Sequence, residues 1–171
     1  MSGNDSWYFS YGSNLSKQQM LLRTGSVPQS QHALLANYRL VFRQVLYSDA
    51  VYATIVPTPD AIVYGVAYLC SPYAMERLDE AEGVSENCYR RETVHVMTNT
   101  KELLTCIVYV GESFETKESK PSSNYLNEIL TGATEHQLPT EYIESVSERA
   151  EYPNGQNDVQ NDVRGNHGVD F

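Results

Sequence analysis

The sequence predicts an α+β fold with a small mixed, barrel-like β-sheet and flanking helices. Runs rich in β-branched and aromatic residues, bounded by Asp, Pro and Gly, dominate the middle of the chain and are typical of strands. Apolar residues with helical spacing follow the first strand, interrupt the later ones and recur near the carboxyl end. The length of 171 residues suits one domain better than two. We therefore predict a single domain over 1–150 and a polar tail over 151–171.

The first half of the chain is expected to supply most of the sheet. A short strand over Trp7–Tyr11 is broken by Gly12-Ser13-Asn14, and a helix follows over Ser16–Arg23. Three strand-like runs come next: Leu34–Val45, Val51–Val56 and Ile62–Leu69. Because Pro57–Asp60 has the composition of a turn, the last two runs are predicted to form an antiparallel hairpin.

The second half begins with a helix that has clear sequence signals at both ends. Ser71 is its predicted N-cap, Pro72 its first residue and Gly83 its C′ residue. After it we expect strands over Tyr89–Met97 and Leu103–Val110, and then a polar loop. That loop covers Glu112–Ser123, and two helices with apolar spacing are predicted around Tyr125–Leu130 and Tyr142–Val146.

The tail over 151–171 has a different composition from the rest of the chain. It is rich in Asn, Asp, Gly and Gln and contains a near-repeat, Asn157-Asp158-Val159 followed by Asn161-Asp162-Val163. Such a segment buries too little apolar surface to order itself. We predict that it is disordered or held only by partners.

Charge and composition exclude several classes of partner. The net charge of −10 repels phosphate backbones, and no cluster of Lys and Arg offsets it, so nucleic-acid binding is not expected. No apolar run reaches eighteen residues, and the amino terminus lacks the features of a signal peptide, so no membrane partner is expected. Cys70, Cys88 and Cys106 are interpreted as reduced, buried thiols. These features predict a cytoplasmic protein.

The first candidate site is the segment from Tyr8 to Leu15, in which a strand ends at Gly-Ser-Asn and turns directly into a helix. Such a turn exposes several backbone N–H groups in one place, and these bind carboxylate or carbonyl oxygens. The alternative is an ordinary connection in which Asn14 or Ser16 caps the helix.

The second candidate is Glu82, which is singled out by helix geometry. At about 100° per residue from Ala74, Leu78 falls near 40°, Glu82 near 80° and Met75 near 100°. Glu82 therefore lies within the apolar arc, whereas the other carboxylates of this helix, Asp79, Glu76 and Glu80, lie on the polar side. Burial and the helix dipole both raise the pKa of such a carboxyl, toward values useful for proton transfer. The alternative is a side chain that extends into solvent at a frayed helix end.

Other chemistries have weaker support. The sequence has no Gly-x-Ser-x-Gly elbow and no nucleotide-binding glycine fingerprint. The four histidines lack metal-ligand spacing, and the apolar surroundings of the three cysteines favour inert thiols. We expect no metal and no cofactor.

Two motifs in this order, Tyr8-Phe9-Ser10-Tyr11-Gly12-Ser13-Asn14-Leu15 and Leu78-Asp79-Glu80-Ala81-Glu82-Gly83-Val84, resemble those of the γ-glutamyl cyclotransferase family. Further similarity lies in Ala53-Thr54-Ile55, in Val63–Tyr68 and around Tyr125. The resemblance covers about residues 7–149 and implies the barrel-like fold of that family.

The resemblance implies a reaction in which the α-amine of a γ-glutamyl group attacks its own γ-carbonyl, releasing 5-oxoproline and an amine. It implies that Glu82 is the acid/base and that Tyr125 contacts substrate. It also implies that the loop holds the γ-glutamyl moiety, through Tyr8, Phe9, Ser10, Tyr11, Gly12 and Ser13. Two alternatives stay open: a non-catalytic module that binds a carboxylate ligand, and a hydrolase that releases glutamate.

The substrate itself is left open by the sequence. A γ-glutamyl amino acid, a γ-glutamylamine and a glutathione-derived conjugate from a biosynthetic or detoxifying pathway all fit the reaction. Some family members carry glycines just before the Ala-Thr-Ile segment, where this chain has Asp49-Ala50-Val51-Tyr52. A bulky Tyr52 beside the pocket is expected to affect which leaving group fits. The expectation of a homodimer rests on analogy with the family alone.

Overall fold

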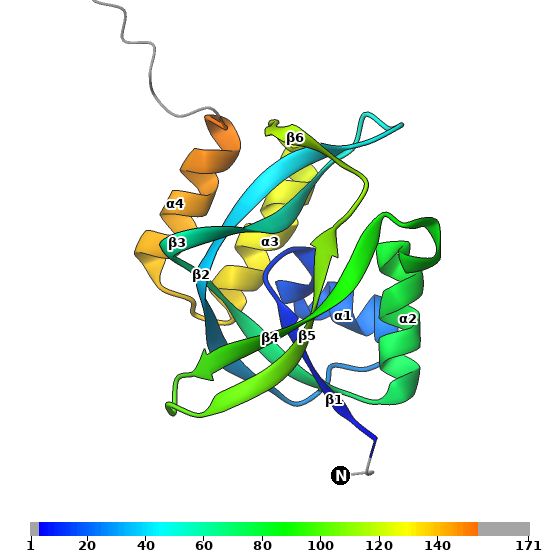
Figure 1. The fold of residues 1–171 in the computed structure, drawn as a ribbon. Coiled ribbons are helices and arrows are strands. Elements are labelled where there is room, and N and C mark those ends of the chain that lie inside the picture. The colour runs from blue at the N-terminus through cyan, green and yellow to red at the C-terminus, as the bar shows by residue number, and fades with distance from the viewer. Residues whose placement is uncertain (1–3, 154–171) are drawn as a thin grey trace, which may run out of the picture.

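The structure is a computed structural model that describes residues 4–153. Strands form the centre and helices the periphery of this part of the chain (Figure 1). In chain order the elements are β1 (Ser6–Ser10), η1 (Ser13–Leu15), α1 (Lys17–Thr24), β2 (Ser30–Val45), β3 (Val51–Cys70), α2 (Pro72–Glu82), η2 (Val84–Glu86), β4 (Tyr89–Thr98), β5 (Leu103–Gly111), β6 (Phe114–Glu118), α3 (Ser123–Glu135) and α4 (Thr140–Glu151).

Five strands close into a barrel. The strand order is β3-β1-β5-β4-β2, and a further pairing between β2 and β3 joins the two ends; β6 is added outside β2. β1 runs parallel to β5, whereas the other pairs are antiparallel, so the sheet is mixed. The predicted α+β fold with a mixed, barrel-like sheet is confirmed.

The predicted hairpin is wrong, because both of its strands belong to the single strand β3. Both halves pair with β2, and the register shifts where Ala36 pairs with Ile62 but Tyr38 pairs with Pro57. The intervening Asn37 adopts a φ of 63°, and its side-chain oxygen accepts a hydrogen bond from the N–H of Asp60 at 3.2 Å. The Pro-rich segment therefore forms a bulge that bends a long strand rather than a turn that reverses it.

The segment Glu112–Ser123 is predicted to be a polar loop, but part of it forms the strand β6. Arg43 of β2 pairs with Glu118, and Val45 pairs with Phe114. The phenyl ring of Phe114 packs edge-on against Tyr89, with 5.1 Å between the ring centroids. The predicted tail falls outside the described residues, except for its first three positions.

The ends of α2 are set by capping residues that the sequence predicts. The Ser71 hydroxyl accepts from the N–H of Ala74 at 3.2 Å, and Gly83 ends α2 with a φ of 62°. In Figure 1, α1 and α2 pack together on one side of the barrel, and α4 lies on the opposite side. None of the helices in residues 4–153 has the length and apolarity needed to span a bilayer.

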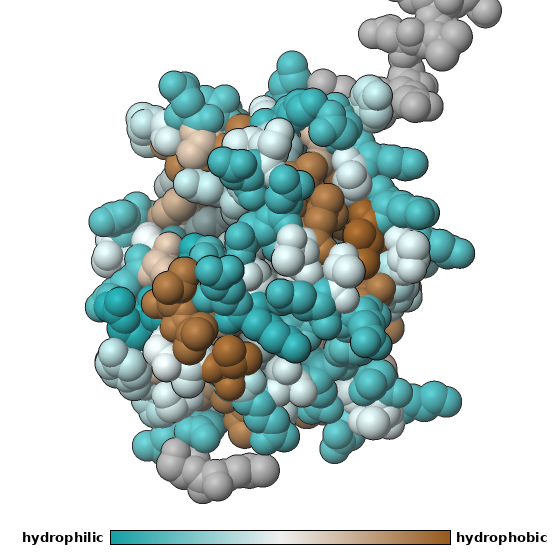
Figure 2. Space-filling model, turned by 180° about the vertical axis from the view of Figure 1, so that it is seen from behind, coloured by the Kyte–Doolittle hydropathy of each residue, from teal (hydrophilic) through white to brown (hydrophobic). Residues whose placement is uncertain are grey.

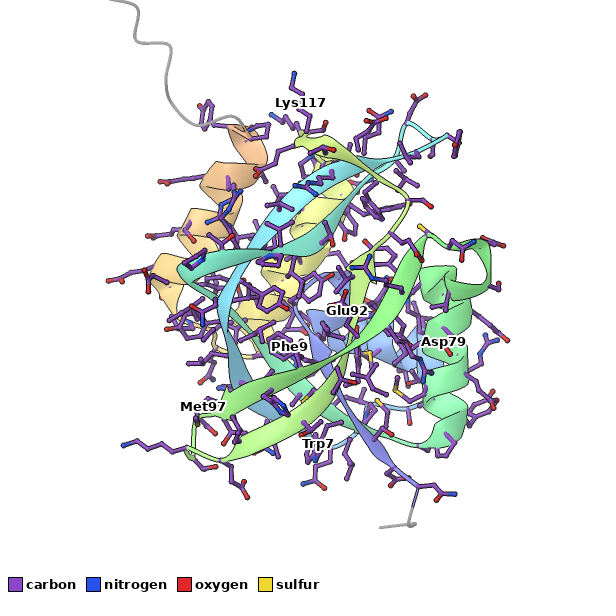
Figure 3. The ribbon with its side chains drawn as sticks, in the orientation of Figure 1. Trp7, Phe9, Asp79, Glu92, Met97 and Lys117 are labelled. Carbon is purple, nitrogen blue, oxygen red and sulfur yellow. The ribbon has the colours of Figure 1, made fainter. Side chains whose placement is uncertain are left out.

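The barrel interior and the space beneath α2 and α3 form one continuous core. Phe9 of β1 is fully buried at its centre (Figure 3). Seen from behind, the surface is mostly hydrophilic, with separate hydrophobic patches (Figure 2). All three cysteines are free; Cys70 and Cys106 are buried as predicted, whereas Cys88 is only half-buried.

Candidate active site

The connection from β1 to α1 turns at Gly12 into η1. The N–H of Leu15 donates to the Gly12 carbonyl at 3.0 Å, and the N–H of Ser16 donates to the Ser13 carbonyl at 3.1 Å. Within residues 4–153, no hydrogen bond uses the N–H of Gly12, Ser13 or Asn14. The loop thus presents adjacent backbone donors that suit a carboxylate or carbonyl oxygen.

Close packing against α3 holds this loop in place. A Cβ atom on Gly132 would lie 2.3 Å from the Ser16 nitrogen and 2.4 Å from the Leu15 carbonyl carbon. Only glycine allows the two backbones to approach so closely. Ser16 then caps α1, since its hydroxyl accepts from the N–H of Gln19 at 3.2 Å. Of the two predicted caps for this helix, Ser16 is therefore the one the structure uses.

Glu82, the last residue of α2, points inward, and its side chain is 14% exposed. Its Oε1 accepts hydrogen bonds from Asn14 Nδ2 at 3.0 Å and from Arg23 Nη1 at 2.9 Å. Arg23 Nη1 also donates to Asn14 Oδ1 at 2.9 Å, which closes a triangle of side chains. No hydrogen bond among the described residues uses Oε2. One oxygen of the carboxylate is thus fixed by the protein, and the other is left for a ligand.

The protonation of Glu82 is set by opposing effects. Burial raises the pKa of its carboxyl above the ordinary value of 4.5, and outweighs the Arg23 charge and the Asn14 hydrogen bond, which lower it. The upward direction agrees with the expectation from the sequence. A carboxyl of this kind exchanges a proton near neutral pH more readily than an exposed one.

Two tyrosines near the start of the chain form one wall of the site. The Tyr8 hydroxyl accepts from Asn14 Nδ2 at 2.9 Å, and the Tyr11 hydroxyl donates to the Tyr109 carbonyl at 2.6 Å. Burial raises the pKa of both phenols well above the ordinary value of 10.0. This wall is therefore polar but uncharged throughout the physiological pH range.

A second pair of tyrosines meets at the backbone of Ala53. The Tyr125 hydroxyl accepts from the Ala53 N–H at 3.0 Å, and the Tyr89 hydroxyl donates to the Ala53 carbonyl at 2.6 Å. The Tyr125 hydroxyl keeps its own hydrogen for a further bond. Its ring lies edge-on to Tyr52, with 5.1 Å between the centroids.

Two adjoining cavities surround Glu82. The inner cavity, of about 30 Å³, and the outer hollow, of about 410 Å³, share four lining residues: Ser13, Glu82, Tyr89 and Tyr125. The inner cavity is completed by Tyr8, Tyr11, Gly12, Asn14, Ala53 and Tyr109. The outer hollow is completed by Gln19, Arg23, Tyr52, Glu80, Ala81, Gly83, Glu86 and Cys88. A ligand whose head reaches the inner cavity must extend its other end into the outer hollow.

Comparisons with known proteins identify the family of this chain. A mouse γ-glutamylcyclotransferase is 32% identical over 163 residues, which cover 91% of this chain and 86% of the mouse protein. Its human counterpart is 34% identical over 146 residues, covering 81% and 76% respectively. The chain belongs to the γ-glutamyl cyclotransferase family. Residues 62–146 of this cyclotransferase also match the model of the AIG2-like family.

The fold gives the same family and the same type of enzyme. A solved structure of a γ-glutamyl cyclotransferase superimposes on this chain with a TM-score of 0.77 and 31% identity, covering 84% of this chain and 87% of the other. The chain is thus an enzyme of the γ-glutamyl cyclotransferase type, as the sequence motifs implied.

Not every predicted site residue of this cyclotransferase lies in the pocket. Tyr8, Tyr11, Gly12, Ser13, Tyr125 and Glu82 come together there, but Phe9 and Ser10 line neither cavity. Both are fully buried, and their positions in β1 pair with Ala67 and Val66 of β3. Consecutive residues of a strand point to opposite faces, so the two side chains leave β1 in different directions. Neither borders a cavity, and contact of Phe9 and Ser10 with a substrate stays a prediction from the resemblance.

Sequence reasoning missed two residues that touch Glu82. The sequence predicts Asn14 in the turn after the first strand, or as a helix cap, and predicts Arg23 at the end of a helix. It indicates no contact of either side chain with Glu82. Arg23 lies in the last turn of α1 and Glu82 in the last turn of α2, and these helices pack together. The basic side chain of Arg23 in the last turn of a short helix is a signal that the sequence does contain. The sequence does not indicate that this helix packs against the one that carries Glu82.

Proposed function

We propose that this chain converts a γ-glutamyl amino acid, a γ-glutamylamine or a glutathione-derived conjugate into 5-oxoproline and the free amine, with Glu82 as general acid/base. The observation that supports this most strongly is the arrangement of the Glu82 carboxylate in the inner cavity. Asn14 and Arg23 hold Oε1, whereas Oε2 has no partner among the described residues. An oriented carboxyl with a raised pKa and one open oxygen suits proton transfer.

The γ-glutamyl group would be held by its oxygens. The unused N–H groups of Gly12, Ser13 and Asn14 are donors for a carboxylate or for the γ-carbonyl oxygen on which negative charge develops. The Tyr125 hydroxyl adds a neutral donor at the junction of the two cavities. Because ring closure is intramolecular, holding the glutamyl chain folded supplies much of the acceleration.

Glu82 would then move one proton from the attacking nitrogen to the departing one. Its carboxylate accepts a proton at Oε2 from the α-amine as the bond from that nitrogen to the γ-carbon forms. The resulting carboxylic acid returns the proton to the amide nitrogen as the bond between that nitrogen and the γ-carbon breaks. The products are 5-oxoproline and the released amine, and Glu82 ends as it began.

Arg23 and Asn14 would act on Glu82 as positioning residues. Both lower the pKa of its carboxyl, which burial alone would raise further. A pKa that is too high would leave Glu82 protonated and unable to accept the proton of the α-amine. The triangle of side chains therefore keeps the ionised form available and aims Oε2 at the ligand.

Replacing Glu82 tests the proposal directly. Glu82→Gln keeps the shape but removes the proton exchange, so release of 5-oxoproline from γ-glutamyl substrates is expected to fall by about a hundredfold to ten-thousandfold. Chromatographic assay of 5-oxoproline measures this, and circular dichroism checks the fold. Glu76→Gln is the matched control, since Glu76 is an exposed residue of the same helix and is expected to retain full turnover.

The products separate the remaining alternatives. Free glutamate in place of 5-oxoproline would identify a hydrolase. A folded protein that binds γ-glutamyl compounds but forms neither product would be a binding module. Turnover by Glu82→Gln equal to that of the unaltered chain would remove Glu82 from its proposed role while leaving the reaction in place.

A further inference from the structure

The outer hollow is the part of the site that a leaving group must occupy, because the inner cavity holds the residues that face the glutamyl head. Its described lining has an excess of negative side chains. Glu80, Glu82 and Glu86 stand against a single cation, Arg23. Arg23 is bound to Glu82 at 2.9 Å, so its charge is already compensated within the site.

The two remaining carboxylates differ in how far they are neutralised. Glu80 pairs with Arg77, an exposed neighbour on α2 that does not line the hollow. Glu86, by contrast, makes no ion pair within residues 4–153. Its Oε2 lies back over Gly83, 3.4 Å from the position that a Cβ on that residue would take. Glu86 thus leaves an uncompensated negative charge in the hollow, four residues beyond the proposed acid/base.

A second feature of the hollow is independent of these carboxylates. The Tyr52 side chain is 38% exposed and lines the outer hollow but not the inner cavity. Its edge-on contact with Tyr125 fixes its ring at the junction of the two cavities. An exposed aromatic ring of this kind attracts an ammonium group.

The thiol of Cys88 lines the same hollow and is affected by the charges of Glu82 and Glu86. Burial raises the pKa of this thiol, and the charges of Glu82 and Glu86 raise it further. The part of this shift that comes from Glu82 and Glu86 has the same sign as their repulsion of a further carboxylate placed nearby. An amino-acid leaving group brings such a carboxylate.

We propose that the outer hollow selects a leaving group that carries a positive charge, so that the preferred substrate is a γ-glutamyl amide of a diamine. Tyr52 and Glu86 are the specificity-determining residues of this subsite. The amine released from the γ-carbonyl would leave past Tyr52, with its second, protonated nitrogen held near Glu86. This proposal rests on the proposed cyclotransferase function and names the substrate class within it.

Three substrates that differ only in terminal charge test the preference. The γ-glutamyl amides of 1,4-diaminobutane, pentylamine and 5-aminopentanoate end in an ammonium, a methyl and a carboxylate on the same four-carbon chain. At low ionic strength kcat/KM for 5-oxoproline release is expected to fall in that order, by about fivefold at each step. Added salt should compress the differences, because the hollow is open to solvent.

Glu86→Gln connects the preference to one side chain. This variant is expected to reduce the ratio of kcat/KM for the ammonium substrate to kcat/KM for the methyl substrate about threefold to fivefold. Glu76→Gln removes the same charge from an exposed site on α2 outside the hollow and should leave all three values unaltered. Tyr52→Leu should selectively lower kcat/KM for the ammonium substrate, by about twofold to fivefold.

The outcomes separate this proposal from the function on which it rests. Turnover of the carboxylate substrate equal to or above that of the ammonium substrate at low salt overturns the charge preference and leaves the cyclotransferase function intact. An equal effect of Glu86→Gln and Glu76→Gln also overturns it. Absence of 5-oxoproline from all three substrates, with a folded protein, overturns the proposed function itself.

Discussion

Two buried ionisable side chains, Glu82 and His136, lie near the loop that follows β1. They differ in what surrounds them. On one side Glu82 contacts Asn14 and borders both cavities. On the other side His136 lies 3.0 Å from the Tyr68 hydroxyl, which is 3.4 Å from the carbonyl of Leu15. His136 lines neither cavity. Burial alone therefore does not distinguish Glu82 from His136; the adjoining cavities and the open Oε2 of Glu82 do.

The pKa shifts of the two groups have a common cause and opposite signs. Burial raises the pKa of the Glu82 carboxyl and lowers the pKa of the His136 imidazole, so each favours its neutral form. The stability linked to Glu82 is present below pH 4.5 and is lost as pH rises through its raised pKa. The stability linked to His136 is present above pH 6.5 and is lost as pH falls through its lowered pKa.

Among the variants that test this difference between Glu82 and His136, the largest effect on turnover is expected from replacing Arg23, the ion-pair partner of Glu82. Arg23→Met removes the guanidinium that fixes Oε1, so the pKa of Glu82 should rise further and the acidic limb of the kcat/KM profile should move to higher pH. Loss of a hydrogen bond to a charged group costs about 1.5–3 kcal/mol, or about tenfold to a hundredfold in kcat/KM at neutral pH. A pH–rate profile of the variant measures both changes.

Arg77→Met is the matched control for this prediction. Arg77 also pairs with a glutamate of α2, but its partner Glu80 is exposed and the ion pair is at the surface. For a substrate with an uncharged leaving group, this variant should keep the pH profile and the turnover of the unaltered chain. An unshifted acidic limb in Arg23→Met would mean that the guanidinium does not tune Glu82.

A smaller effect, confined to stability, is expected on the far side of the loop. Tyr68→Phe removes the hydroxyl that lies between His136 and the Leu15 carbonyl, and should lower the free energy of unfolding by about 0.5–1.5 kcal/mol. Turnover should change by no more than about twofold, because no group that borders the cavities is altered. Urea unfolding and the 5-oxoproline assay measure the two quantities. A large loss of turnover at unchanged stability would show that the two sides are not distinct.

The smallest effect should appear only in the pH dependence of stability. His136→Gln keeps a side chain able to hydrogen-bond Tyr68 but removes the titrating imidazole. The decline in melting temperature as pH falls below about 6.5 should therefore be shallower than in the unaltered chain. Thermal unfolding at a series of pH values between 5 and 7 measures the slope. An identical slope in both proteins would contradict the assignment of this acid sensitivity to His136.

The features that the sequence predicted are those set by local geometry. The inward position of Glu82 follows from the angular spacing of α2, and the ends of that helix follow from Ser71 and Gly83. The N–H groups of the loop after β1 follow from Gly12 and its neighbours. All of these features can be predicted without information on which elements pack against each other.

The features that were missed depend on contacts between distant segments. Arg23 and Glu82 are 59 positions apart and meet only because α1 packs on α2. The Pro57–Asp60 segment has the composition of a turn, but β2 pairs with the chain on both sides of it. The limits of the domain, a cytoplasmic location and a homodimer remain predictions from the sequence.

Closure of the barrel also affects how the protein behaves at high concentration. β6, a strand of only five residues, lies outside β2 and forms one edge of the sheet. Glu115, Lys117 and Glu118 place charge along that short strand. Short, charged edges resist strand addition from other chains, so this edge is protected against edge-to-edge aggregation.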